Sequence, residues 1–386
     1  MSADVIVVGA GVIGAATAFH LSLLDAGDVL VLDRDHVGSG MSSRSSALVR
    51  MHYAFGPEVE LAVRSDQMFD AWPQLVGAPH CVRRTGFVRI VLPGEEPQLR
   101  ANVAMQQARG AKVELIDGAT LAEVAPGLVA YDVTWAAWEE HGGYGNGSVV
   151  AGDMLEAARR GGVGYRPHSA VRSLLRRGDR VVGVETDAGA ELAGTVVLAA
   201  GVWSPPLLAG VGLRLPIEGE LHHVAVLKHE AGRGAPVACI DSTTQTYFRP
   251  EGSPETTLVG AFAGSPIDLP DSAPPGPDPA ELAAIAASAS RRVPALQDAG
   301  ITGGVIGVYD MTPDARPLLG IVPGLDGLVV AAGFSGMGFK ISPAVGEALA
   351  ELVTTGDSTR VDLRPFRPSR FDEGEPISPP FPYSDD

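Results

Sequence analysis

The sequence has 386 residues, 45% of them hydrophobic, which indicates a globular chain long enough for two domains. Its formal net charge of -17 would repel phosphate backbones, so we expect no nucleic-acid partner. Cys81 and Cys239 cannot form a disulfide framework or a metal site, and no apolar run is long enough to cross a membrane. We therefore expect a soluble, cytoplasmic protein that acts on a small molecule.

The N-terminal segment predicts a dinucleotide-binding site. A buried-strand run ends at Gly9, and Gly11 and Gly14 then lead into an apolar helix. Gly9 permits a tight turn, Gly11 lets a pyrophosphate approach the backbone, and Gly14 lets helix and strand pack closely. A second strand over 29–32 delivers Asp33 about 20 residues later, where a carboxylate can bind an adenosine ribose. A purely structural turn is the alternative for the glycines alone, and the choice between NAD and FAD stays open at this point.

The next segments predict a loop along the nucleotide and then a second layer. Residues 38–46 are rich in glycine and serine, whose hydroxyl and N–H groups suit phosphates. Helices are expected over 58–72, where Pro73 ends the first one, and over 95–109. A strand over 83–92 lies between them, which suggests that a second domain has begun.

The middle of the chain is predicted to return to the first domain. A loop at 141–147 precedes a helix at 148–160, and strands at 170–175 and 180–186 form a hairpin-like pair. The apolar run 195–201 ends on glycine, as parallel strands of a nucleotide-binding sheet do. The nucleotide-binding domain is therefore expected to be discontinuous.

The last half predicts the second sheet and the end of the first domain. Strands with long connections are expected at 221–227, 244–248, 257–261 and 301–309. Between the last two strands, a proline-rich loop is expected at 268–279 and a helix at 279–293. A buried strand at 328–333 leads to a glycine-rich turn. Ser342 is then expected to be the N-cap and Pro343 the first residue of a helix that ends near Thr354.

These motifs resemble the D-amino acid oxidase superfamily of FAD enzymes, most of all its sarcosine oxidase and dimethylglycine dehydrogenase branch. The matching residues span nearly the whole chain and comprise the N-terminal glycines, Arg50 within 48–50, and the segments 197–203, 247–252, 311–314 and 333–347. The resemblance implies FAD as cofactor, a substrate domain whose sheet covers the isoalloxazine ring, and oxidation of an amine by transfer of a hydride equivalent to the flavin. The imine product is then hydrolysed by water.

The resemblance and the residue patterns together predict an α/β (α+β) fold with a Rossmann-like FAD-binding domain and a second domain built on a large mixed or antiparallel sheet. The FAD-binding domain is expected to comprise 1–80, 148–215 and 310–364, and the substrate domain 81–147 and 216–309. Residues 365–386 are rich in proline and are expected to form a tail on the surface.

The expected FAD contacts come from the glycine turn, the serine-rich loop and the later motifs. They are Gly9, Gly11, Val12, Ile13, Gly14, Asp33, Arg34, Ser42, Ser43, Arg44, Ser45, Ser46, Val171, Ala200, Gly201, Trp203, Gly307, Gly336, Met337, Gly338, Phe339 and Lys340. Monomeric sarcosine oxidases carry the flavin on a cysteine just before the Thr-Pro-Asp segment, but this chain has Gly307 there. We therefore expect non-covalent FAD, and attachment to a histidine is the alternative.

Lys340 occupies the place of the family lysine that pairs with the substrate carboxylate, and Arg50 is the next candidate for that role. The expected catalytic residues are Lys340, Arg50, Arg249 and Tyr247, and the expected further pocket residues are His52, Tyr53, Tyr144, Tyr309 and Met337. For each, a structural role such as packing or an ion pair is the alternative. Arg249 stands where the resemblance suggests an oxygen-activating lysine, so the reaction with O2 is in question.

The sequence thus predicts an FAD-dependent oxidase of a small amino acid, N-methylated or otherwise secondary, that yields an imine and H2O2. A flavin dehydrogenase that passes electrons to a carrier or quinone, or a biosynthetic tailoring enzyme, is the alternative among enzymes. A flavin-binding scaffold subunit is the non-enzymatic alternative. No metal is expected, and neither the exact substrate nor the oligomeric state can be derived from the sequence.

Overall fold

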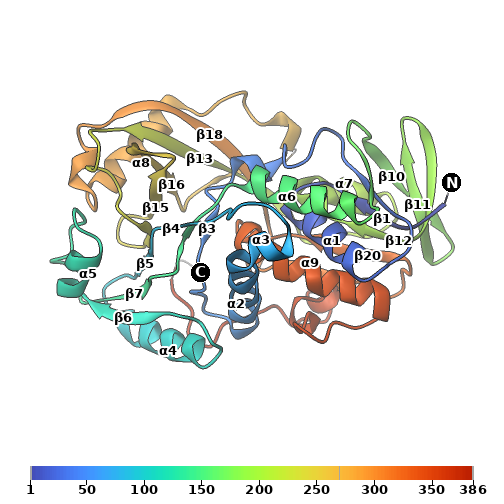
Figure 1. Cartoon of the computed structure of the whole chain (residues 1–386), viewed down its shortest axis with the longest axis horizontal. Helices are drawn as coiled ribbons and strands as arrows, with labels where there is room; N and C mark the ends of the chain where they lie inside the picture. Colours follow the sequence, from blue (N-terminus) through green and yellow to red (C-terminus); the bar gives the residue numbers. More distant parts are fainter. Residues whose placement is uncertain (1, 269, 385–386) are drawn as a thin grey trace.

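The structure is a computed structural model and describes residues 2–268 and 270–384. Leu269 of the predicted proline-rich loop and Asp385 and Asp386 of the predicted tail lie outside the described residues. Two large sheets lie side by side, the first at the right of Figure 1 and the second at the left, and each has its own helices.

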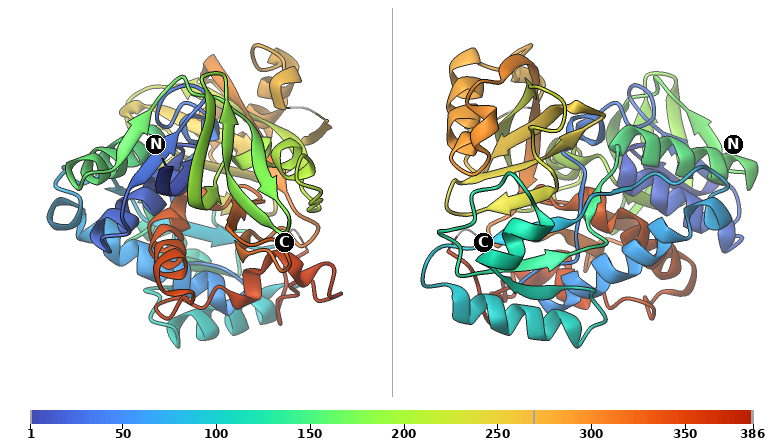
Figure 2. Two further views of the ribbon diagram at one scale, coloured as in Figure 1. Left: turned by 90° about the vertical axis from the view of Figure 1, so that its right-hand side faces the viewer. Right: turned by 60° about the vertical axis from the view of Figure 1, so that its left-hand side comes forward.

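The first sheet has eight strands and carries the glycine-rich motif. Its strands are β1 (Ser2–Val8), β2 (Val29–Leu32), β9 (Gly164–Arg166), β10 (Val171–Arg177), β11 (Arg180–Thr186), β12 (Gly189–Leu198), β19 (Leu318–Ile321) and β20 (Leu328–Ala332). The order is β10-β11-β12-β1-β2-β9, with β20 also paired to β12 and β19 to β20. β12 is parallel to both β1 and β20, as predicted for a strand that returns to the N-terminal sheet. The left view of Figure 2 brings β10, β11 and β12 to the front in green.

Three long helices pack together beside this sheet: α1 (Val12–Leu23), α6 (Gly147–Arg160) and α9 (Gly338–Thr355). α1 and α9 approach closely because small residues face each other, and a Cβ added at Gly346 would lie 2.5 Å from the Cβ of Ala16. α9 also contacts α2 (Gly56–Asp70). Two short helices complete this half: α3 (Trp72–Leu75), directly after α2, and α7 (Ser204–Ala209). None of the described helices has the length and hydropathy needed to span a membrane.

Two helix boundaries differ from the prediction. The last helix begins at Gly338, so Ser342 is not its N-cap and Pro343 lies inside it. Pro343 has no N–H for the carbonyl of Phe339, but the Ser342 hydroxyl donates to that carbonyl at 2.8 Å, which lets the helix tolerate the proline. Pro73 lies in the short helix α3, and α2 ends before it at Asp70.

The second sheet is mixed, as predicted. Its strands are β5 (Phe87–Ile90), β6 (Glu114–Asp117), β7 (Trp135–Glu139), β13 (Glu218–Lys228), β14 (Ala238–Asp241), β15 (Thr246–Glu251), β16 (Ser253–Ala261), β17 (Ser265–Ile267) and β18 (Gly300–Met311). The order is β17-β13-β16-β15-β14-β5-β7-β6 with β18 beside β13, and β14 and β5 form a parallel pair among antiparallel ones. The helices α4 (Glu96–Gln107), α5 (Gly118–Val124) and α8 (Pro279–Ser290) belong to this half.

A small sheet joins the halves. It consists of β3 (Leu48–Val49), β8 (Gly143–Tyr144) and β4 (Arg83–Arg84), so the predicted strand over 83–92 is split between β4 and β5. The strands of the first sheet come from the segments expected to form the FAD-binding domain, and those of the second sheet come essentially from the segments expected to form the substrate domain. We therefore propose these segments as the two domains.

The C-terminal segment is a surface tail only in part: residues 372–376 and 380–382 are exposed, but other residues of the segment are buried. Phe366 and Arg370 are fully buried, and the Arg370 guanidinium makes two hydrogen bonds of 2.8 Å to the buried carboxylate of Asp314. Tyr383 is only 5% exposed. The prediction was wrong for these buried residues because proline content does not reveal long-range partners such as Asp314.

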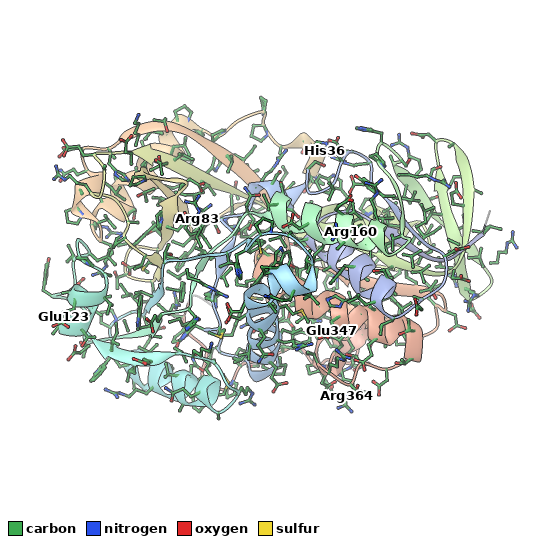
Figure 3. The ribbon with its side chains drawn as sticks, in the orientation of Figure 1. His36, Arg83, Glu123, Arg160, Glu347 and Arg364 are labelled. Carbon is green, nitrogen blue, oxygen red and sulfur yellow. The ribbon has the colours of Figure 1, made fainter. Side chains whose placement is uncertain are left out.

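We expect Arg370→Ala to lower the free energy of unfolding by about 3–5 kcal/mol, because it leaves Asp314 buried without its ion-pair partner. Chemical denaturation of the purified protein measures this loss. Arg364→Ala is the matched control, since Arg364 pairs with Asp362 at the surface and extends from the lower edge of the molecule (Figure 3). Equal destabilisation by both substitutions would contradict the assigned role of the buried pair.

Candidate functional site

The glycine turn between β1 and α1 leaves the N-terminus of α1 open to a ligand. Gly9 has φ +102°, and an added Cβ would lie 2.4 Å from the carbonyl oxygen of Ala199. A Cβ at Gly14 would lie 1.9 Å from the Gly9 oxygen, so Gly14 serves helix packing as predicted. Asp33 Oδ2 accepts the N–H of Ala10 at 2.7 Å, which fixes the carboxylate at the end of β2 beside the turn.

A long cavity of about 670 Å³ starts at this turn. Seventeen of the expected FAD contacts line it: Gly9, Gly11, Val12, Ile13, Asp33, Arg34, Ser42, Arg44, Ser45, Val171, Ala200, Gly201, Trp203, Gly307, Gly336, Gly338 and Phe339. Gly11, Val12 and Ile13 at the N-terminus of α1 line the cavity, where the helix end can offer N–H groups to phosphates, and the Val12 N–H also donates to Ser42 Oγ at 3.1 Å. Asp33 lies where a ribose hydroxyl would be bound. The residues present therefore fit an extended dinucleotide.

The other expected FAD contacts lie elsewhere. Ser46, Met337 and Lys340 line an adjoining cavity. The hydroxyl of Ser43 donates to two backbone carbonyls of its own loop, at 3.1 and 2.9 Å, and the residue does not line the long cavity. Ser43 therefore stabilises the loop, and the structure gives no support to a contact between its side chain and FAD.

The wall of the long cavity includes a contact between the halves that the sequence did not reveal. The Arg34 guanidinium lies 4.1 Å from the ring centroid of Trp203, and both side chains bind the carboxylate of Asp271. The distances are 2.9 Å from Arg34 Nη2 and 2.9 Å from Trp203 Nε1. Asp271 follows β17, so the predicted proline-rich loop contributes to the wall of this cavity.

The adjoining cavity has a volume of about 410 Å³ and shares Ser45, Tyr309, Gly336 and Phe339 with the long cavity. Seven of the expected catalytic or substrate-binding residues line it: Lys340, Arg50, Tyr247, His52, Tyr53, Tyr309 and Met337. Their convergence from the segment after β3, from β15 and β18, and from α9 and its N-cap places a second compartment beside the first.

Lys340 and Arg50 bring two cations to the same aromatic ring. Arg50 Cζ lies 4.3 Å and Lys340 Nζ 5.9 Å from the ring centroid of Tyr53. Burial and repulsion by Arg50 hold the pKa of Lys340 well below its usual value. Glu58, which acts in the opposite direction on that pKa, is itself ion-paired with Arg316 at 3.2 Å. The cavity is therefore suited to a ligand that brings a carboxylate.

Further polar residues of the adjoining cavity were missed by the sequence reasoning. They are Arg89, Glu220, Arg316, Ser335 and Tyr383. Arg89 lies within the fully buried strand β5, and a charged residue in such a strand was the signal available in the sequence. His222, on β13, stacks on Tyr309 with a centroid distance of 4.0 Å and contacts Glu220 at 2.8 Å. Burial keeps the pKa of His222 low.

Arg249 and Tyr144 line neither cavity, in contrast to the expectation. The Arg249 guanidinium lies 4.2 Å from the Tyr144 ring centroid, pairs with Glu251 at 2.5 Å and donates to the carbonyl of Ser46. Tyr247 and Arg249 share one face of β15, but Arg249 is about 7 Å farther along the strand. The structure therefore gives Arg249 and Tyr144 a structural role between the segments of the wall.

Glu139 fixes the backbone between Arg50 and His52. It is fully buried at the end of β7, and its Oε2 accepts the N–H of Met51 at 2.7 Å. Burial raises the pKa of Glu139 to about 8, although that hydrogen bond and the charge of Arg50 oppose the rise. Glu139 therefore positions the strand segment that carries two residues of the cavity.

Comparison with known proteins agrees with this geometry. Residues 4–352 match the family model DAO, described as FAD dependent oxidoreductase. The chain is 31% identical to 4-methylaminobutanoate oxidase (formaldehyde-forming) of Paenarthrobacter nicotinovorans, over 94% of this chain and 45% of that protein. It is 24% identical to mitochondrial sarcosine dehydrogenase of Mus musculus, over 96% of this chain and 42% of that protein. The chain thus spans less than half the length of these two relatives.

A solved structure shares the fold. L-proline dehydrogenase from P. horikoshii superposes with a TM-score of 0.89 at 24% identity, over 97% of this chain and 99% of that one. The α/β architecture with two large sheets predicted from the sequence is confirmed.

We expect Glu139→Gln to flatten the pH dependence of stability between about pH 5 and pH 8. The unfolded chain ionises this carboxyl near pH 4.5, but the folded chain keeps the proton up to about 8, so wild-type stability falls as pH rises through this window. Thermal unfolding at several pH values measures the difference. Glu140→Gln, at the exposed neighbouring position, should follow the wild-type curve. A variant curve parallel to that of the wild type would show that Glu139 is not buried in its neutral form.

Proposed function

The chain belongs to the DAO family of FAD-dependent oxidoreductases, and from this premise we propose that it oxidises the C–N bond of a small amino acid, or of an N-methyl or secondary amino acid, to an imine while O2 is reduced to H2O2. The observation that supports this most is the pair Lys340 and Arg50 in a small cavity that adjoins the long cofactor cavity. A carboxylate bound there would hold the substrate beside the shared wall of both cavities.

The cofactor is FAD, and non-covalent binding is typical of the family. When bound, FAD accepts the two electrons of the substrate. The glycine turn and Asp33 would hold its phosphates and ribose, and the shared residues Tyr309 and Gly336 would border its reacting end. Gly307 lines the long cavity without a side chain, and neither Cys81 nor Cys239 lines either cavity, which agrees with non-covalent binding.

The substrate nitrogen must be neutral before it can be oxidised. An alkylammonium with a pKa near 10 requires a shift of about three units at neutral pH, which costs about 4 kcal/mol. Lys340 and Arg50 provide part of this energy by binding the carboxylate, and their positive charges and the burial of the cavity disfavour an ammonium group.

A dehydrogenase that passes electrons to a carrier protein or a quinone is the second candidate function. Among the described residues that line the two cavities, Lys340 is the one lysine, and we propose that it binds the substrate carboxylate and not oxygen. Arg249, which the sequence offered in place of an oxygen-activating lysine, lines neither cavity. Relatives with both kinds of name exist, namely 4-methylaminobutanoate oxidase and sarcosine dehydrogenase.

We expect anaerobic addition of a small or N-methylated amino acid to bleach the flavin absorption of the purified protein. A screen of sarcosine, proline, glycine and D-amino acids, read by absorbance, bypasses the electron acceptor. Subsequent admission of air should restore the flavin and yield one H2O2 for each flavin reduced. Bleaching followed by slow reoxidation would favour the dehydrogenase, and a flavin that no amino acid reduces would contradict the proposed substrate class.

We expect Lys340→Met to weaken binding of acetate, a carboxylate without an amine, by about 10- to 150-fold while FAD remains bound. In the wild type, acetate affinity should fall as pH rises through the lowered pKa of Lys340, because acetate binds the protonated Lys340 side chain more tightly than the neutral one. The Lys340→Met variant should lose this pH dependence. Calorimetric titration measures both effects. Lys228→Met is the control, since Lys228 is exposed on β13. Wild-type affinity in Lys340→Met would instead indicate a larger amine substrate without a carboxylate at this position.

A further inference from the structure

We propose that Tyr383, from the C-terminal segment, forms the wall of the adjoining cavity that limits the size of the substrate. This inference rests on the proposed function, because it assumes that the adjoining cavity binds the substrate. Tyr383 lines that cavity although it lies 43 positions after Lys340 and far from the other lining residues in the sequence.

The Tyr383 side chain is held at the cavity by contacts on both its hydroxyl and its ring. Its hydroxyl lies 2.9 Å from Nε2 of His52, and the two rings are stacked with an interplanar angle of 18°. Arg89 Cζ lies 5.0 Å from the ring centroid of Tyr383. His52 is buried, and this burial together with the charges of Arg89 and Arg50 keeps its pKa low, so the hydroxyl meets a neutral imidazole.

Residues on either side of Tyr383 anchor the segment to α4 and its N-terminus. The Phe381 carbonyl accepts the side-chain amide of Asn102, a buried residue of α4, at 2.9 Å. The N–H and hydroxyl of Ser384 both donate to Glu95 Oε1, each at 2.7 Å. Two anchors so close to Tyr383 leave its backbone little freedom, so the ring can act as a fixed boundary and not as a mobile end.

The consequence is a size limit set by an aromatic ring. With the carboxylate at Lys340 and Arg50, the remainder of the substrate must fit within about 410 Å³, between the shared cofactor wall and the wall made by Tyr383, His52 and Arg89. Removal of the ring enlarges the cavity, whereas removal of the hydroxyl alone leaves its dimensions unchanged. The ring is therefore the part of Tyr383 that determines specificity.

The test compares binding of acetate and of benzoate to the full-length, FAD-loaded protein by calorimetric titration. Tyr383→Ala should raise the preference for benzoate over acetate by about 10-fold or more relative to the wild type, with little change for acetate. Tyr383→Phe should retain the wild-type preference. Phe381→Ala is the matched control, because this aromatic residue of the same segment is 43% exposed and does not line the cavity.

An unchanged benzoate preference in Tyr383→Ala, or an equal loss of both ligands, would overturn the inference and leave Tyr383 a purely structural anchor. If Tyr383→Ala does not fold, Tyr383→Leu retains apolar contact and should shift the preference in the same direction by a smaller factor. Failure of the proposed function gives a different result, because acetate affinity would then be insensitive to Lys340→Met whatever the Tyr383 variants do.

Discussion

Lys340 and Arg50 bring two basic side chains into one cavity, and the surrounding structure has to compensate for the cost of positive charge there. Positive charge without a nearby anion is costly away from water, and the lowered pKa of Lys340 expresses that cost. The Tyr53 ring lies against both groups, and Glu58 contributes negative charge while it pairs with Arg316. A substrate carboxylate would complete this balance, and under the proposed function the same electrostatic constraint would favour a neutral amine beside it.

The two halves of the chain meet at this cavity through contacts of different kinds. Glu139, from the second sheet, fixes the backbone on which Arg50 and His52 are carried. Asp271 reaches from the second half to Arg34 and Trp203 in the wall of the long cavity. Local sterics shape the glycine turn that borders this cavity, but other parts of its wall depend on side chains from distant segments. Closure of the site is therefore a property of the assembled halves.

The C-terminal segment extends this arrangement. Arg370 is fixed to Asp314 beneath the surface, and Tyr383 reaches the cavity itself. The segment thus links the stability of the fold to the shape of the site: one residue contributes a buried ion pair and another contributes a wall. The same segment contains many prolines, which stiffen a chain that has little regular secondary structure.

The sequence by itself determined the features that depend on local spacing: the β1 turn with Gly9 and Gly14, the carboxylate at Asp33, and the buried strands of the first sheet. These could be predicted because a tight turn or a strand is defined by neighbouring residues. Lys340 was singled out by the family resemblance of its motif. Tertiary structure alone decided that Asp271, Arg89 and Tyr383 reach the cavities and that Arg249 does not. Each of these outcomes depends on which distant group a side chain meets. Arg249 contacts the Tyr144 ring and the Ser46 carbonyl. Tyr383 contacts His52, while its neighbour Phe381 is anchored to Asn102 of α4. Such long-range pairings leave no periodic pattern along the chain, since they are fixed only when the two sheets pack together.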